Sequence, residues 1–139
     1  MFLLDTNVLS ALRRPDTAPA QLVAWAAETP ITDLYVSVMS VYEIDIGIRR
    51  IERRDAVQGG VLRAWFARSV LGNFRGRILP VDEAVAMKCA ELQVPDPKAE
   101  RDCFIAATAL VHRVVLVTRN VRDFVATGVE LLNPWDGQS

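Results

Sequence analysis

Five short apolar runs alternate with longer amphipathic segments along this chain, and this alternation limits the folds that it can adopt. The runs occupy residues 2–4, 35–38, 78–81, 114–117 and, more weakly, 130–132. Helical patterns occupy residues 19–28, 40–53, 57–71, 82–92 and 98–112, and the pair Gly59-Gly60 weakens the third of them. Strands alternating with helices predict an α/β three-layer sandwich, with helices on both faces of a central, mostly parallel sheet of about five strands.

Length and composition predict a single domain outside the membrane. The 139 residues are enough for one domain over residues 1–139. No apolar stretch approaches the roughly 18 residues that span a bilayer. The start MFLLDTN lacks the basic residues of a signal peptide. We therefore expect a cytoplasmic protein. Because 51% of the residues are hydrophobic, we also expect another chain to cover part of its surface.

The cysteines and the charges exclude some kinds of site. Cys89 and Cys103 stand apart from each other, in no C-x-x-C motif and beside no histidine cluster, so they predict neither a zinc site nor a disulfide. The net charge of −1 argues against a protein that coats nucleic acid through bulk charge. All but two of the 16 basic residues are arginine, whose planar guanidinium is the better partner for phosphate.

Four acidic side chains occupy comparable places beside the predicted strands. Asp5 ends the first run, Glu43 lies in the first turn of the helix after run 35–38, and Asp102 lies near the start of the last helix. Asp123 follows the run 114–117 by a few residues. In a parallel sheet these positions meet at the carboxyl ends of the strands, where ligands bind. Carboxylates gathered there repel one another unless a cation is present, and oxygen ligands favour Mg²⁺ or Mn²⁺.

Each of these four residues also has a structural interpretation. Asp5 is also typical of a turn residue that starts the next helix. The segment Ser40-Val41-Tyr42-Glu43 fits a capping box, in which the glutamate binds the amide of the first residue. Asp102 also fits a helix-dipole acid, and Asp123 a surface or capping acid.

Several motifs together resemble a known family. They are LLDTNVLSAL at the start, SVYEI in the middle, then RDCFIAATAL, LVTRNVRDF and, near the end, LLNPWDG. In this order they resemble a PIN-domain ribonuclease, and more narrowly a VapC-type toxin of a type II toxin–antitoxin system. The resemblance covers residues 1–139. It implies a catalytic set of Asp5, Glu43, Asp102 and Asp123. Asp5 and Asp102 would bind Mg²⁺, with Mn²⁺ as a substitute, and Glu43 would bind it directly or through water.

The resemblance leaves the fourth acidic place open. Many relatives carry aspartate where this chain has Asn120, whereas in others the aspartate three residues later, here Asp123, takes that role. One or two metal ions therefore fit the sequence. Thr6 and Thr118 would support the site with hydroxyls that orient a ligand or phosphate, although each also fits an ordinary helix cap or strand end.

The resemblance implies hydrolysis of RNA phosphodiester bonds by a water that the metal activates. Local arginines would bind the phosphates of the RNA substrate; the candidates are Arg13, Arg14, Arg101, Arg119 and Arg122. His112 follows a helix and fits a helix-end cation better than a general base.

The resemblance also implies partners. They are a VapB-like antitoxin and a second copy of the chain, in a homodimer or a toxin–antitoxin hetero-oligomer. The alternative is a catalytically silent PIN-fold module that binds RNA or the antitoxin and ignores metal.

Overall fold

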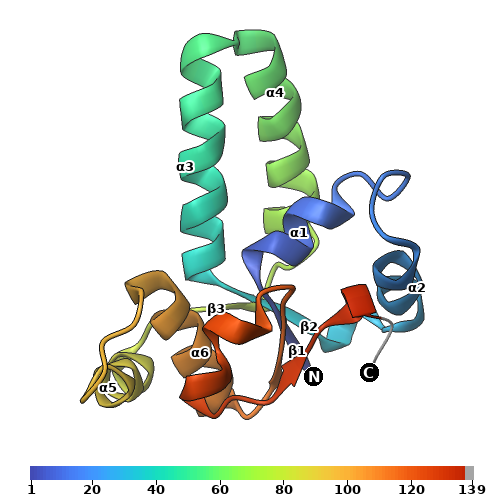
Figure 1. The fold of residues 1–139 in the computed structure, drawn as a ribbon. Coiled ribbons are helices and arrows are strands. Elements are labelled where there is room, and N and C mark those ends of the chain that lie inside the picture. Colours follow the sequence, from blue (N-terminus) through green and yellow to red (C-terminus); the bar gives the residue numbers. More distant parts are fainter. Residues whose placement is uncertain (137–139) are drawn as a thin grey trace.

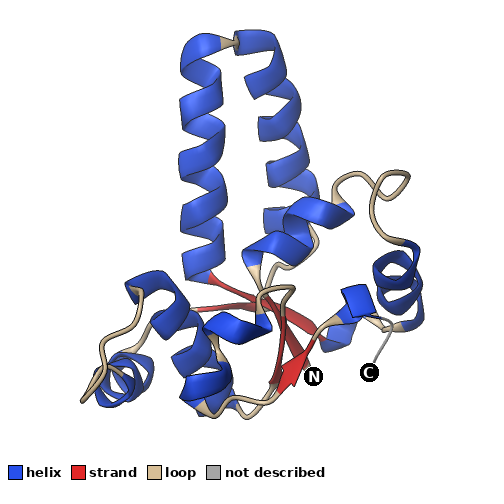
Figure 2. Ribbon diagram, in the orientation of Figure 1, coloured by secondary structure: helices blue, strands red, loops and turns tan. Residues whose placement is uncertain are grey.

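A five-stranded parallel sheet forms the centre of the molecule. The computed structural model describes residues 1–136. The strands are β1 (Phe2–Leu4), β2 (Leu34–Ser37), β3 (Ile78–Leu79), β4 (Val115–Val117) and β5 (Leu131–Leu132), in the spatial order β3-β2-β1-β4-β5. Leu4 is paired with Val36 on one side and with Val117 on the other, and every pairing is parallel. The predicted α/β sandwich with a parallel sheet is confirmed (Figure 2).

Helices cover both faces of the sheet. They are α1 (Thr6–Leu12), α2 (Ala20–Glu28), α3 (Val38–Arg54), α4 (Ala56–Trp65), α5 (Glu83–Leu92) and α6 (Glu100–His112), and a π-helical segment (Phe66–Gly72) continues α4. Alternate residues of β1 point into separate cores. Leu4 packs with residues of α1 to α4, whereas Leu3 packs with Ile105 of α6. This alternation is the expected period of a strand and produces the three layers.

The helix after β2 begins earlier than the sequence pattern predicts. Ser37 is its N-cap, because its hydroxyl accepts a hydrogen bond from the amide of Met39 at 3.0 Å. The predicted start at residue 40, and with it the capping-box interpretation, is wrong. Ser40 is fully buried inside α3, and Glu43 lies in the second turn rather than the first.

Helices α3 and α4 form a hairpin that projects away from the sheet (Figure 1). The break falls at Asp55, which caps α4 by accepting a bond from the amide of Gln58 at 3.0 Å. Gly59 does not interrupt α4, contrary to the weak point predicted there. A Cβ at Gly59 would lie 2.6 Å from Cγ of Glu52, so the missing side chain lets α4 approach α3 closely.

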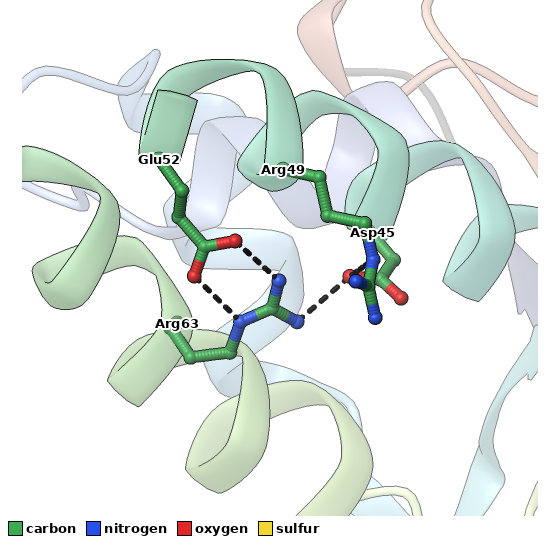
Figure 3. Close-up of polar contacts among 4 residues, drawn as sticks. All are labelled: Asp45, Arg49, Glu52 and Arg63. Atoms are coloured by element: carbon green, nitrogen blue, oxygen red, sulfur yellow. Dashed lines mark hydrogen bonds and ion pairs between the residues drawn. The ribbon is translucent and has the colours of Figure 1, made fainter. Parts of the chain in front are cut away.

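One arginine connects the two helices of the hairpin (Figure 3). Arg63 of α4 donates to both carboxylate oxygens of Glu52, at 2.9 and 3.1 Å, and to Asp45 at 2.7 Å. Arg49 adds a bond to Asp45 at 3.2 Å. These bonds lower the pKa of Asp45 and of Glu52 and raise that of Arg63, so all three stay charged. Arg63 thus joins α4 to α3 through a bidentate contact with Glu52 and a single contact with Asp45.

The two cysteines are buried between α5 and α6. The Cys103 thiol donates to the carbonyl of Cys89 at 3.5 Å, and burial raises the pKa of Cys89 to about 12. Such thiols are inert, which confirms their interpretation as apolar residues. Among residues 1–136, no helix is long and apolar enough to cross a membrane.

Candidate active site

The site lies where the chain order of the sheet reverses, between β1 and β4. Asp5 follows β1, and its amide donates to the carbonyl of Val117 at 2.9 Å. Its carboxylate is 6% exposed and caps α1 by accepting from the amide of Thr6 at 2.8 Å. The helix-starting interpretation of Asp5 is therefore correct. It is compatible with a functional one, because the same position is the crevice in which parallel α/β sheets bind ligands.

Two side chains, one after β4 and one in the first turn of α1, lie against the other oxygen of Asp5. The buried hydroxyl of Thr118 donates to Oδ2 at 2.8 Å, and the Asn7 amide lies 3.4 Å from the same atom. The Thr118 hydroxyl also accepts from the amide of Asn120 at 3.0 Å. Asn7 is a site residue that the sequence analysis did not assign, although it is the third letter of the D-T-N motif.

Glu43 reaches the same region from α3. Its Oε1 accepts from the Thr6 hydroxyl at 3.1 Å, and its Oε2 accepts from Arg101 at 3.1 Å. The Thr6 hydroxyl lies 2.9 Å from the Ser40 hydroxyl as well. Thr6 thus connects α1 to α3, and Arg101 connects α3 to the first turn of α6.

The pKa values show that the acidic side chains share one electrostatic environment. Burial raises the pKa of Asp5, and the charges of Glu43 and Asp123 raise it further, against the bonds from Thr118 and Thr6. Burial also raises the pKa of Asp102, followed by the charges of Asp5 and Asp123. Asp5 therefore lies within range of the charges of Glu43, Asp102 and Asp123, although these residues come from separate segments.

The two candidates for the fourth acidic place differ in what they contact. Asp123 ends an exposed 3-10 turn (Val121–Asp123) and acts on Asp5 and Asp102 through its charge. Asn120 is exposed and contributes its backbone amide to Thr118.

The donor atoms around Asp5 are those that a hard cation prefers. They are carboxylate oxygens and the Thr118 hydroxyl, and the mutual repulsion that adds to burial in raising the pKa of Asp5 and Asp102 is what a bound cation relieves. Within residues 1–136, no three His, Cys, Asp or Glu side chains stand close enough to form a ready ligand group. The carboxylate oxygens of Asp5 and Asp102 still fit Mg²⁺ in kind, whereas Arg101 occupies one oxygen of Glu43.

The arginine candidates lie in different surroundings. Arg101 and the half-buried Arg13 line a groove of about 250 Å³ that also includes Thr6 and Glu43. The backbone of Arg119 contacts Asn7 at 3.4 Å, and its guanidinium lies 5.9 Å from the ring centroid of Trp135.

The remaining basic residues differ in exposure and in their position relative to the site. Arg14 and Arg122 are exposed. His112 ends α6, at the opposite end from Asp102. Arg50 and Tyr42 line a cleft of about 640 Å³ that Asp102 also lines, and neither was among the predicted site residues.

Replacing Thr118 by valine should lower stability, because Oδ2 of Asp5 would lose its closest donor in a buried place. We expect a loss of about 1–3 kcal/mol and a further rise in the pKa of Asp5, since the Thr118 bond lowers it. Urea unfolding in EDTA and an NMR titration of the Asp5 carboxyl measure the two effects. Thr118→Ser keeps the hydroxyl and serves as the control. Equal stability of the two variants would contradict this role.

The protein is a parallel α/β protein with an acidic crevice at the switch point of its sheet. Comparisons with known proteins identify its family. The PIN domain family model matches residues 2–129. Toxin FitB of Neisseria gonorrhoeae is 36% identical, over 97% of this chain and 99% of the relative. VapC ribonuclease Y4jK of Sinorhizobium fredii is 33% identical, over 98% and 99%. The crystal structure of FitAcB from Neisseria gonorrhoeae superimposes with a TM-score of 0.88 at 36% identity, over 97% of this chain and 99% of that chain. This chain belongs to the PIN-domain family, and close homologues are FitB and VapC toxins.

Proposed function

We propose that this protein is a metal-dependent endoribonuclease and the toxin of a toxin–antitoxin pair. The observation that carries the proposal is the buried carboxylate of Asp5 in the β1/β4 crevice, within the field of Glu43, Asp102 and Asp123. Relatives that match nearly the whole chain are named a toxin and a ribonuclease, which supports the same reaction class.

Asp5 and Asp102 would hold Mg²⁺, or Mn²⁺ in its place, and Glu43 would take part directly or through a water molecule. Asp123 is the better candidate for the fourth acidic place, because its charge acts on both proposed ligands. When bound, the metal supplies Lewis acidity toward a water molecule and toward the scissile phosphate.

The chain's own side chains orient these groups and bind the substrate. Thr118 and the Thr6 amide each hold one oxygen of Asp5, which fixes the direction of its remaining lone pairs. Arg13 and Arg101, which line the groove beside Glu43, would bind RNA phosphates through charge-assisted hydrogen bonds.

The test is cleavage of a pool of single-stranded and structured RNA by the purified, antitoxin-free protein in Mg²⁺, Mn²⁺ or EDTA. Asp102→Asn, purified in parallel, reports contaminating nuclease. We expect cleavage with either metal, none in EDTA, and none by the variant. Equal cleavage by both proteins would mean contamination. RNA that is bound but uncut under every condition would favour the silent binding module.

The partners that fit this function are an antitoxin of the VapB kind and a second copy of the chain. A relative named as a toxin implies a protein that restrains it. The exposed apolar side chains Tyr42, Val57, Val61 and Met87 are surface that such partners would cover.

A further inference from the structure

Both oxygens of Glu43 are already occupied in the structure, one by the Thr6 hydroxyl and the other by the Arg101 guanidinium. An oxygen that accepts a charge-assisted bond from arginine is a poorer metal ligand, because the cation has to displace that arginine. Arg101 therefore occupies the place that a metal needs at Glu43.

The contact between Arg101 and Glu43 can exchange at little cost. The Arg101 side chain is 53% exposed and the Glu43 side chain 22% exposed, and a single Nη1–Oε2 distance of 3.1 Å joins them. Ion pairs of this kind contribute little stability. The guanidinium can form two parallel bonds with a phosphate, so a phosphate is a strong competitor for it.

The position of the pair makes it accessible to a nucleic acid strand. Glu43 and Arg101 both line the groove that contains Thr6 and Arg13, and both line the wider cleft that contains Tyr42 and Arg50. The pair thus lies between two hollows on the protein surface. A strand that passed from one hollow to the other would bring a phosphate against Arg101.

We infer that Arg101 is a positioning residue that holds Glu43 away from the metal until an RNA phosphate draws the guanidinium off. This inference rests on the proposed function. RNA binding and metal binding are then coupled through one side chain, and by linkage each strengthens the other. Arg101 does not touch the reacting atoms. It controls when the Glu43 carboxylate is free to bind the metal.

Two binding measurements test the inference without relying on cleavage. The first is the affinity for Mn²⁺ alone, followed by the loss of the free-ion EPR signal. Arg101→Gln should bind Mn²⁺ about five- to tenfold more tightly than the unaltered protein, the lower range of typical coupling. Arg53→Gln removes the same charge at the far end of α3 and should leave the Mn²⁺ affinity unchanged.

The second measurement is the affinity for a short single-stranded RNA in EDTA, where cleavage does not interfere. Glu43→Gln should tighten RNA binding, because Arg101 loses its competing carboxylate, and adding Arg101→Gln should abolish that gain. A through-space charge effect alone predicts that the gain from Glu43→Gln persists when Arg101→Gln is added, so the loss of the gain in the double variant identifies the competition for Arg101. Unchanged or weaker Mn²⁺ binding by Arg101→Gln, with normal binding by the unaltered protein, would overturn this inference alone. Failure of both the unaltered protein and Arg101→Gln to bind Mn²⁺ would overturn the proposed function with it.

Discussion

Asp5→Asn should abolish metal-dependent RNA cleavage and make the metal-free protein more stable. The substitution removes a proposed metal ligand, and even the partners that orient such ligands reduce activity up to about 100-fold when lost, so we expect at least that loss. Asparagine keeps one oxygen to cap α1, and its NH2 group can donate to the Thr118 hydroxyl in place of the bond that Asp5 accepts, so the fold persists. Cleavage assays in Mg²⁺ and thermal unfolding in EDTA measure the two effects.

The gain in stability should depend on pH in a defined direction. Because the folded-state pKa of Asp5 lies above its ordinary value of 3.8, the folded state binds the proton more tightly than the unfolded state. The contribution of Asp5 to the stability of the metal-free protein therefore rises as the pH falls through its folded-state pKa, and it stops changing below the unfolded value. The stability advantage of Asp5→Asn should shrink over that same window.

A variant with an exposed charge provides the control for this experiment. Asp16→Asn removes one carboxylate from the loop after α1, where it is exposed, and should not reproduce the pH-dependent difference. Adding Mg²⁺ should remove the advantage of Asp5→Asn at neutral pH, because the metal neutralises the buried charge. An Asp5→Asn protein less stable than the unaltered one at every pH would mean that the ionised carboxylate stabilises the fold.

The three layers, and the edge of the sheet at which the site lies, could be predicted because they depend on local sequence patterns. Short apolar runs separated by helix-length segments leave few alternatives to a parallel sheet, and this placed the strand ends at one edge. That β1 and β4 are neighbours, with Thr118 against Asp5, follows only from the structure. The start of α3 was harder, because Ser37 and Ser40 both precede helical sequence. Burial of Ser40 against Thr6 of α1, a contact distant in the sequence, decides between the two serines.

The contacts between side chains within the site could not be predicted from the sequence, because they also join residues that are far apart in the chain. Glu43 and Arg101 are 58 residues apart, and nothing in either segment indicates that they pair. Gly59 in the same way looks like a break in a helix until Glu52 is seen against it. The residue types at a site follow from motifs, whereas the partner of each side chain follows from how helices pack over the sheet.

Phe124→Ala should be the most destabilising single substitution near the site. Phe124 is 1% exposed and packs with Leu3 and Leu116 of the sheet and with Ile105 of α6. Removing a buried phenylalanine ring costs about 3–5 kcal/mol through lost burial and the cavity that remains. Urea unfolding in EDTA measures the loss. Val125→Ala alters the next residue, which is 65% exposed, and should change stability by less than about 0.5 kcal/mol.

The same ring anchors the turn that carries Asp123, so its loss should also reach the site. The amide of Phe124 donates to the carbonyl of Val121, and that of Asp123 to the carbonyl of Asn120, so the buried residue belongs to the same turn. In Phe124→Leu, which keeps most of the apolar volume, the fold should persist while the turn becomes looser. If Asp123 fills the fourth acidic place, that variant should bind Mn²⁺ more weakly even when it is fully folded. Unchanged Mn²⁺ affinity in a folded Phe124→Leu protein would instead argue that the metal depends on Asp5 and Asp102 without Asp123.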